Sequence, residues 1–401
     1  MNLQDCFEKP ISGEWGTESD NPSETVPVLR TTNFADDGSI TYEELAYRKI
    51  DVQKKKNKIL RSGDIIIEKS GGTPTKPVGR TVFFEPADKR TYFCNNFTAI
   101  LRMKTDKVLP KYAWYLLQQQ YKMRRVEKFQ NRTTGISNLD VAGYLHDIDF
   151  DVPDVQMQEK RIAIIDHIRD IVLDYKKYLA QLDTLVKAEF VELFGDLKNN
   201  PYHWDRGYFS DAIEGSLQNG LYKPQSAYTA NSSTGTPILR IDAFYDGKVT
   251  DFSKLKRLSC TEEEKELYHL NEDDIVINRV NSIEYLGKCA HIVGLREETV
   301  FESNMMRFHV TEEYHPTFIT AILCSKYMKT QIENHAKKSV NQASINQQDV
   351  QSFEIIKPPL ALQNQFADFV AQVEKQKAAV QKSISTLATL RASLMQTYFR
   401  R

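Results

Sequence analysis

The sequence predicts an α+β protein in which two globular domains alternate with two long helices that pair with each other. Three observations support this prediction. The 401 residues exceed the length of one ordinary domain, the two halves repeat the same order of segments, and a sustained heptad pattern follows each globular half. The expected boundaries are residues 1–152 for the first globular domain, 153–200 for the first long helix, 201–357 for the second globular domain and 358–401 for the second long helix.

The composition excludes several classes of protein. Hydrophobic residues make up 41% and charged residues 27%, which fits folded domains rather than a disordered chain. The 53 Lys and Arg residues balance 54 Asp and Glu residues, so any charge that binds nucleic acid has to be local. No apolar run is long enough to span a membrane, and no apolar segment follows Met1 as in a signal peptide. The five cysteines form no C-x-x-C pair, which favours reduced thiols in a cytoplasmic protein.

An internal repeat relates the two halves. The strand-like stretches 26–34 and 236–244 match with an offset of 210 residues. Further along the chain the offset falls to 205, and from Pro153 and Pro358 onward the match continues without a gap. A gapless stretch of about 40 residues behind a gapped one predicts a long helix that follows a domain rich in loops.

Each globular half combines short strands with one late helix. β-branched and aromatic runs such as 65–67, 81–84 and 275–277 alternate with Gly, Pro and Asn, which is the pattern of strands joined by turns. The helices are expected at 110–129 and 316–336, each introduced by a proline. Each half is therefore predicted to be a compact α+β domain.

The two long helices are predicted by apolar residues that alternate in steps of three and four from 158 to 194 and, with interruptions at Lys377 and Arg391, in the second half. Such a helix cannot bury its apolar stripe alone, so we expect the two helices to pair. The alternative is two unrelated surface helices on separate domains. The residues expected to pair are Ile165, Ile168, Val172, Leu179 and Leu182 in the first helix and Val370, Val373, Val380, Ile384 and Leu387 in the second.

Basic residues concentrate in the first half. Between residues 101 and 132 there are nine Lys or Arg residues against two acids, interleaved with Tyr112, Trp114, Tyr115 and Tyr121. This excess favours contact with phosphates, and the alternative is a solvated helix face.

Polar loops suited to contact DNA occur twice in each half, once after the matched strand and once before the long helix. Lys and Arg suit phosphates, whereas Arg, Asn, Gln, Ser and Thr can also read bases in a groove. The alternative for each residue is a turn that caps backbone groups. The candidates in the first half are Lys69, Ser70, Lys76, Arg80, Arg124, Arg125, Arg132, Thr133 and Thr134. Those in the second half are Asn278, Arg279, Asn281, Ser282, Lys337, Lys338, Asn341 and Gln342.

The order of these segments resembles that of a known family. Each long helix is introduced by a Pro-x-x-x-x-Gln element, at 153–158 and 358–363, and a short polar segment stands ahead of it, at 134–139 and 342–346. This duplicated order resembles the specificity (S) subunit of type I restriction-modification systems, and the resemblance covers nearly the whole chain. The individual motifs are short, so their repeated order carries the resemblance.

The resemblance implies a non-catalytic DNA reader. The globular parts would be target-recognition domains related by a pseudo-two-fold repeat, each reading one half of a bipartite target in double-stranded DNA. The helices would pair antiparallel as a coiled coil, separate the two readers and dock modification (methyltransferase) subunits, two being expected. Because the loop residues differ between the halves, the two half-sites are expected to differ. This chain would bind no cofactor, the modification subunit would use S-adenosylmethionine, and a restriction subunit, if present, would use ATP and Mg²⁺.

Enzymatic alternatives find little support in the sequence. No G-K-[ST] motif of a P-loop and no strand followed by G-x-G-x-x-G is present. Residues 357–360 only partly resemble the Asn-Pro-Pro-aromatic motif of adenine methyltransferases, since the amide and the aromatic residue are both missing. Neither the cysteines nor the eight histidines show the spacing of metal ligands, so we expect no catalytic and no metal site.

Two other hypotheses stay open. The chain could be a coiled-coil interaction scaffold whose globular domains bind protein or carbohydrate. It could also be a divergent metal-dependent nuclease, because Asp251 and the segment 263–265 have roughly the spacing of an Asp and a Glu-x-Lys element.

Overall fold

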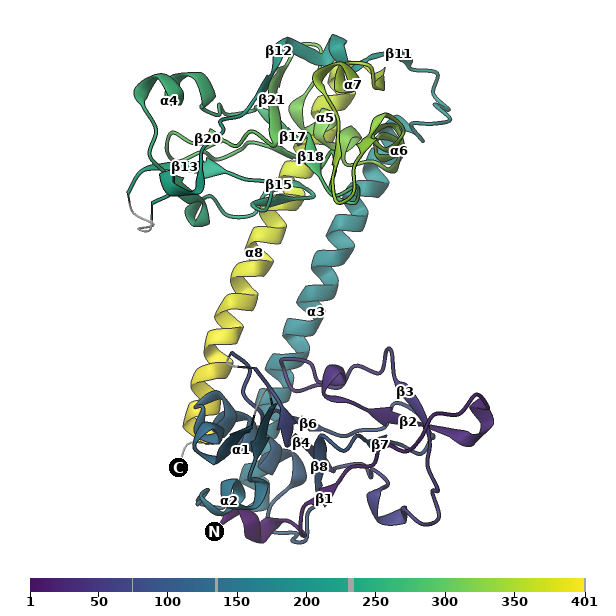
Figure 1. The fold of residues 1–401 in the computed structure, drawn as a ribbon, viewed down its shortest axis with the longest axis vertical. Helices are drawn as coiled ribbons and strands as arrows, with labels where there is room; N and C mark the ends of the chain where they lie inside the picture. The colour runs from purple at the N-terminus through teal and green to yellow at the C-terminus, as the bar shows by residue number, and fades with distance from the viewer. Residues whose placement is uncertain (74, 134–135, 230–233, 400–401) are drawn as a thin grey trace. The chain divides into compact units, whose positions relative to one another are not determined.

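The computed structural model describes residues 1–73, 75–133, 136–229 and 234–399 (Figure 1). The chain forms two compact units, the first made of 1–176 with 382–401 and the second of 177–381. Each unit contains one globular domain together with part of both long helices, α3 (Val155–Phe194) and α8 (Leu360–Tyr398). The boundary between the compact units falls within both long helices.

Three small sheets build the first unit. The first has the order β1 (Ile11–Ser12), β8 (Thr98–Leu101), β4 (Ile65–Glu68) and β6 (Thr81–Phe83), and all its neighbours are antiparallel. In the second, β2 (Thr25–Leu29) lies between β3 (Ala46–Lys49), which is antiparallel to it, and β7 (Phe93–Cys94), which is parallel. The third has the order β5 (Ser70–Gly71), β10 (Ile136–Leu139) and β9 (Gln130–Thr133).

Two helices accompany these sheets, α1 (Pro110–Lys122) and α2 (Val141–His146). Pro110 stands at the first turn of α1, where its missing N–H costs no hydrogen bond. Helix α1 packs against the first sheet, with Trp114 and Phe83 ring centroids 5.8 Å apart. The predicted helix 110–129 ends earlier than expected, because Arg124 adopts a left-handed conformation (φ 58°) and a 3-10 turn follows it.

The second unit repeats this plan with a larger sheet. Its six strands have the order β12 (Ile213–Asn219), β21 (Met305–Val310), β17 (Ile275–Asn278), β19 (Cys289–His291), β15 (Gly247–Val249) and β14 (Phe244–Tyr245). Two three-stranded sheets have the orders β16 (Lys256–Leu258), β13 (Thr236–Leu239), β20 (Val300–Phe301) and β18 (Val280–Asn281), β23 (Ala343–Ser344), β22 (Lys337–Lys338). Strands β11 (Asp205–Tyr208) and β24 (Glu354–Lys357) pair with each other.

The helices of the second unit are α4 (Glu262–Tyr268), α5 (Pro316–Leu323), α6 (Lys326–His335) and α7 (Gln347–Gln351). The single helix predicted at 316–336 is therefore wrong in one respect, since it is split between α5 and α6. The split occurs at Ser325, whose side chain accepts a hydrogen bond from the Met328 amide and so caps a new helix.

The repeat seen in the sequence is also present in the strand pairing. In the first unit Val28 of β2 lies opposite Phe93 of β7 in a parallel pair. In the second unit Ile238 of β13 lies opposite Val300 of β20, again in a parallel pair. Val28 and Ile238 are 210 residues apart, which is the offset of the matched strands. The matched strands therefore hold the same place in each unit.

Within the first unit, the end of α8 contacts the beginning of α3. The Arg161 guanidinium donates a hydrogen bond to the Tyr398 carbonyl oxygen at 3.0 Å and lies over the Tyr398 ring. Ile165 belongs to the same buried cluster as Met395 and Phe399. Low-numbered residues of α3 thus meet high-numbered residues of α8, as in an antiparallel pair.

Within the second unit the two helices also run antiparallel. Tyr178 donates to the Gln376 side-chain oxygen at 3.2 Å, and the Phe194 ring lies 5.7 Å from that of Phe366. Lys377, which was expected to interrupt the stripe, forms an ion pair with Asp183 at 2.6 Å instead.

All ten residues expected to pair are at least partly buried. Ile165, Ile168, Leu182 and Val373 are buried, whereas Val172, Leu179, Val370, Val380, Ile384 and Leu387 are half-buried.

None of the helices in the described part of the chain combines the length and the hydrophobicity that a membrane span requires.

Candidate nucleic-acid interface

In the first unit, two polar segments that lie far apart in the sequence join in one small sheet. Strand β5 follows β4 almost directly, and β10 belongs to the hairpin that precedes α3. In the register of this sheet, Ser70 lies opposite Asn138, and the Ser70 hydroxyl donates a hydrogen bond to the Asn138 side-chain oxygen at 2.7 Å. The two candidate loops of the first half are therefore adjacent in space.

The second unit contains the same arrangement, in which β18, β23 and β22 form one sheet. Asn281 of β18 lies opposite Ala343 of β23, and Lys338 of β22 also pairs with Ala343. The Ile345 amide donates to the Arg279 carbonyl oxygen at 3.0 Å and extends this connection. The loop after the matched strand and the hairpin before α8 thus form one surface, which we call the β18–β23–β22 surface.

The hairpin of the β18–β23–β22 surface is the most accessible part of the candidate interface. Lys337, Lys338, Asn341 and Gln342 are all exposed, and Val340 at the tip is 98% exposed. Two cations thus stand next to two amides without competition from packing. This combination suits simultaneous contact with phosphates and base edges.

Not every candidate of the second half is accessible. Asn278 is fully buried, and neither polar atom of its side chain has a hydrogen-bond partner among the described residues. Arg279 is half-buried and donates to the Ser303 carbonyl oxygen at 3.4 Å, and the Asn281 side chain accepts from the Ser282 amide. Because a buried side chain cannot reach a groove, Asn278 is removed from the set of expected DNA contacts.

Several candidate side chains of the first half already bind other side chains of the same unit. Arg80 forms an ion pair at 2.9 Å with Glu68, which is buried, and Lys76 forms one with Asp36 at 2.7 Å. Lys69 is half-buried, and its amine donates to the Ser12 hydroxyl at 2.7 Å. Arg80 is thus held inside the fold, whereas exposed Lys76 can exchange its partner for a phosphate.

The candidates in and before the first hairpin differ in how much of each residue the structure describes. Arg124 is exposed and forms an ion pair with Glu127, and Arg125 is half-buried. Arg132 and Thr133 lie in β9, where only their backbone is described, and Thr134 lies outside the described residues.

The basic excess between residues 101 and 132 is smaller in the fold than in the sequence. Arg102 is buried and donates two hydrogen bonds to the Asp64 carboxylate, at 2.9 Å and 2.7 Å, which raise the pKa of its guanidinium. Lys111 pairs with Asp166 at 2.9 Å. Lys128 pairs with Asp147. Acids from distant parts of the sequence thus neutralise cations that looked uncompensated, so fewer of these cations are available for phosphates than the sequence suggested.

The aromatic residues of the same stretch belong to the core. Tyr112, Trp114 and Tyr115 are buried, and burial is the main cause that raises the pKa of Tyr115. The Tyr121 hydroxyl donates to the Pro77 carbonyl oxygen at 2.9 Å. The alternation of basic and aromatic residues therefore reflects an amphipathic helix rather than a platform on which bases stack.

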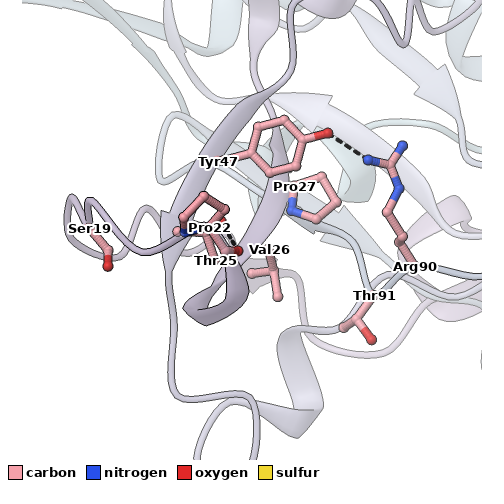
Figure 2. Close-up of a pocket in the computed structure, with 8 residues that line it drawn as sticks. All are labelled: Ser19, Pro22, Thr25, Val26, Pro27, Tyr47, Arg90 and Thr91. Carbon is pink, nitrogen blue, oxygen red and sulfur yellow. Dashed lines mark hydrogen bonds between the residues drawn. The ribbon is translucent and has the colours of Figure 1, made fainter.

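A hollow that the sequence did not reveal lies beside β2 and β3 in the first unit (Figure 2). Its volume is about 600 Å³. Arg90 carries the charge on its wall, donates to the Tyr47 hydroxyl and forms an ion pair with Asp88 at 2.7 Å. The hydrogen bonds from Arg90 lower the pKa of Asp88 to about 2. Because the cation is already neutralised, the hollow is poorly suited to an anion. It is lined by Ser19, Pro22, Thr25, Val26, Pro27, Tyr47, Arg90 and Thr91.

The residues considered for a metal-dependent nuclease have structural tasks. Asp251 caps a short 3-10 turn, and the hydrogen bonds from Ser253 and Lys254 lower its pKa to about 2. Glu264 accepts from the Thr261 amide in the capping box of α4, and Lys265 pairs with Glu262. Across the described ranges, no group of three or more His, Cys, Asp and Glu residues is placed to hold a metal ion.

Comparison with known sequences connects this geometry to one family. The family model described as "Type I restriction modification DNA specificity domain" matches residues 1–181 and 216–388. The chain is 24% identical over 401 residues to the specificity subunit of the type I restriction enzyme StySPI from Salmonella potsdam, a match that covers 93% of this chain and 80% of that protein.

A second relative is matched over a shorter stretch. The chain is 28% identical over 201 residues to the MjaX specificity subunit of a type I restriction enzyme from Methanocaldococcus jannaschii. This match covers 50% of the chain and spans about half the length of that relative, 46%.

Solved structures share the fold. One is a chain from a type I restriction-modification system whose assembly and conformational transition were determined, with a TM-score of 0.59 and 16% identity, covering 100% of this chain and 97% of that one. Another is the S subunit of a type I restriction-modification system from M. genitalium, with a TM-score of 0.56 and 14% identity, covering 100% and 96% of the two chains. At these identities the likeness concerns the fold.

Proposed function

Because the chain belongs to the type I restriction-modification DNA specificity family, we propose that it is the non-catalytic subunit that selects the DNA sequence on which a modification subunit acts. Each globular domain would be a target-recognition domain that reads one half of a bipartite target in double-stranded DNA. The observation that carries the proposal is the sheet that joins two polar segments in each unit, β5–β10–β9 in the first and β18–β23–β22 in the second.

The hairpins of these sheets are the parts that we propose for DNA contact. In the second unit, Lys337 and Lys338 would neutralise phosphates, and Asn341 and Gln342 would reach base edges in a groove. The two units carry different residues at these positions, so the two half-sites would differ in sequence. Arg80 is left out of this set because it pairs with Glu68. Asn278 is left out because it is buried.

The long helices would serve as a coiled-coil ruler and as a docking platform. Two readers that meet one face of a duplex need binding sites about one helical turn apart, roughly 34–36 Å. The antiparallel contacts between α3 and α8 inside each unit support such pairing. Large apolar side chains on the helices remain exposed and would suit modification subunits, two of which we expect. These side chains are Leu173, Tyr178, Leu185, Val191 and Leu390.

The chemistry of modification would belong to the partners. The modification subunit would supply S-adenosylmethionine chemistry, and a restriction subunit, where one joins, would use ATP and Mg²⁺. This chain would position them on DNA without binding a cofactor itself.

The decisive experiment is co-expression with a type I modification subunit followed by mapping of methylated bases in the host genome. The expected result is a split motif with two unlike half-sites and a fixed unread spacer. A complex that forms without methylating any motif would overturn the reading role and favour an interaction scaffold. Metal-dependent cleavage of DNA by the isolated chain would favour a nuclease.

A further inference from the structure

Two cysteines of the second unit face each other. The Cys289 and Cys324 sulfur atoms are 3.6 Å apart, although the residues are separated by 35 positions in the sequence. Cys289 lies in β19 and is 1% exposed, whereas Cys324 directly follows α5 as its C-cap and is exposed. One residue of the pair is therefore at the surface, and its neighbour is buried beneath it.

The equivalent position in the first unit holds a different pair. Thr81 lies opposite Ile67 in β4–β6, as Cys289 lies opposite Ile277 in β17–β19. The Gln118 side-chain amide donates a hydrogen bond to the Thr81 carbonyl oxygen at 2.6 Å.

Gln118 and Cys324 also correspond along the chain. Gln118 belongs to α1, which begins after Leu109, and Cys324 is the C-cap of α5, which begins after His315. Gln118 lies nine residues after Leu109, and Cys324 lies nine residues after His315. Both units thus bring the same two elements into contact, and the second unit replaces a polar contact with two thiols.

The surroundings give the two thiols different chemistry. The hydrogen bond from the Cys289 thiol lowers the pKa of Cys324 and outweighs burial and the Asp246 carboxylate, which act in the opposite direction. The same contact and burial raise the pKa of Cys289. The thiolate is the reactive form of cysteine. Cys324 is therefore the better nucleophile, and Cys289 is suited to be the resolving cysteine that attacks the oxidised sulfur.

We propose that Cys289 and Cys324 form an oxidation site that takes a hydroperoxide and closes to an intrachain disulfide. The Cys324 thiolate would attack the outer oxygen of the peroxide, so that the O–O bond breaks, a sulfenic acid forms and, with one proton, water or an alcohol leaves. Cys289 would then lose its proton and attack the Cys324 sulfur. The S–S bond forms as the S–O bond breaks, and the released hydroxide takes up a proton as water.

The reaction requires little movement. A disulfide needs its sulfur atoms about 2.05 Å apart, so these two must approach by roughly 1.5 Å, which side-chain rotation at the end of a helix can supply.

The bond would tie β19 to the junction of α5 and α6. Helix α6 already holds the loop before β19, because the Lys329 amine donates to the Ile283 and Glu284 carbonyl oxygens at 2.7 Å and 2.8 Å. The disulfide would thus add a covalent link near these hydrogen bonds. Both would then connect helices α5 and α6 to the stretch of chain from Arg279 to β19.

The test uses the reduced full-length chain treated with hydrogen peroxide, followed by alkylation and peptide mapping without reductant. We expect the loss of two of the five thiols and a cross-linked peptide pair that contains Cys289 and Cys324. Cys289→Ser should leave a sulfenic acid at Cys324 that dimedone traps, and Cys324→Ser should abolish the cross-link. Cys260→Ser is the matched control in the same unit and should form the disulfide as the parent does.

Other outcomes would overturn the proposal. These are oxidation of Cys260 at least as fast as that of Cys324, conversion of Cys324 to sulfinic acid in the parent chain without a cross-link, or persistence of both thiols. Each of these outcomes is measured on the parent chain, so the test remains decisive even where a cysteine variant fails to fold.

Discussion

Gln158 and Gln363 are buried at equivalent positions of the two units and make the same set of hydrogen bonds. In the first unit the Gln158 side-chain oxygen accepts from the Leu109 amide at 2.8 Å. Its amide group donates to the carbonyl oxygens of Lys107 and Pro153, at 2.8 Å and 2.9 Å. One side chain therefore joins the first turn of α3 to the residue that precedes α1.

The second unit repeats this connection with other residues. The Gln363 oxygen accepts from the His315 amide at 2.9 Å, and its amide group donates to the Glu313 and Pro358 carbonyl oxygens at 3.2 Å and 2.9 Å. Both glutamines are 0% exposed. The Pro-x-x-x-x-Gln element thus has a structural role. The proline stands between the domain and the long helix, and the glutamine links the two by hydrogen bonds.

Removing either glutamine should destabilise its own unit. Gln158→Ala removes the partner of one amide and two carbonyl groups in a partly buried place, so we expect a loss of about 2–4 kcal/mol in the free energy of unfolding. Urea unfolding would measure it. Gln156→Ala, at an exposed position of the same helix turn, is the control and should change little. Equal effects of the two variants would mean that the bonds of Gln158 contribute nothing specific.

The basic stretch of the first half offers a contrast between a structural and a surface cation. Arg102→Ala would leave the buried Asp64 carboxylate without its cationic partner, and we expect a loss of about 3–5 kcal/mol in unfolding free energy. Arg124→Ala breaks an exposed ion pair and should cost less than about 1 kcal/mol. If both variants unfold at the same urea concentration, the assignment of Arg102 to the core is wrong.

The contrast between these two arginines shows where reasoning from sequence reached its limit. Local spacing was enough to predict α3, α8 and the matched strands, because an apolar period or a proline acts over a few residues. The pairing of Arg102 with Asp64 spans 38 residues, and no local pattern marks it. The same holds for Ser70 and Asn138, which meet only because β5 and β10 join in one sheet. Candidate loops could be named from sequence, but their assembly into one surface could not.

The hairpin of the β18–β23–β22 surface should control binding to any duplex. Lys337→Ala with Lys338→Ala removes two exposed cations, so the affinity should fall and the slope of log K against log salt should flatten by about 2. Fluorescence anisotropy over a salt series on the full complex would measure both. Lys198→Ala, an exposed lysine elsewhere in the second unit, is the control. An unchanged slope in the hairpin variant would remove these lysines from the interface.

The amide at the hairpin tip should act on specificity rather than on charge. Asn341→Ala leaves the cations in place, so the salt slope should hold while discrimination in one half-site relaxes by about 1–3 kcal/mol per base pair. Methylation mapping with the variant would reveal a degenerate position in that half-site alone. Degeneracy in both half-sites, or none, would contradict a base contact at Asn341.

Acidification should destabilise the second unit through His315. Burial lowers the pKa of His315 from its ordinary value of 6.5, and its ring Nδ1 accepts a hydrogen bond from the Thr317 amide, which requires an unprotonated nitrogen. The folded-state pKa lies below the unfolded one, so the unfolded chain binds more protons as the pH falls through 6.5. This contribution to stability is present above that pH and is lost below it.

The measurement is urea unfolding at about pH 7.5 and pH 5.5. His315→Asn keeps a side chain that can cap α5 and removes the titration, so its stability should fall less between the two conditions. His167→Asn alters an exposed histidine of α3 and should behave as the parent chain. A parent and a His315→Asn variant with the same pH dependence would assign the effect to other groups.

Two leucines of α3 should separate helix packing from partner docking. Leu182 is 4% exposed, and Leu182→Lys would bury a cation in the apolar stripe, so we expect a loss of about 3 kcal/mol or more in unfolding free energy. Leu185 is 46% exposed on the same helix, and Leu185→Lys should leave that free energy nearly unchanged. If α3 docks the modification subunit through its exposed apolar residues, Leu185→Lys should still weaken co-purification with that subunit. A stable Leu185→Lys chain that binds the subunit as tightly as the parent would place the docking surface elsewhere, while an unaltered Leu182→Lys chain would mean that the stripe does not hold the helices together.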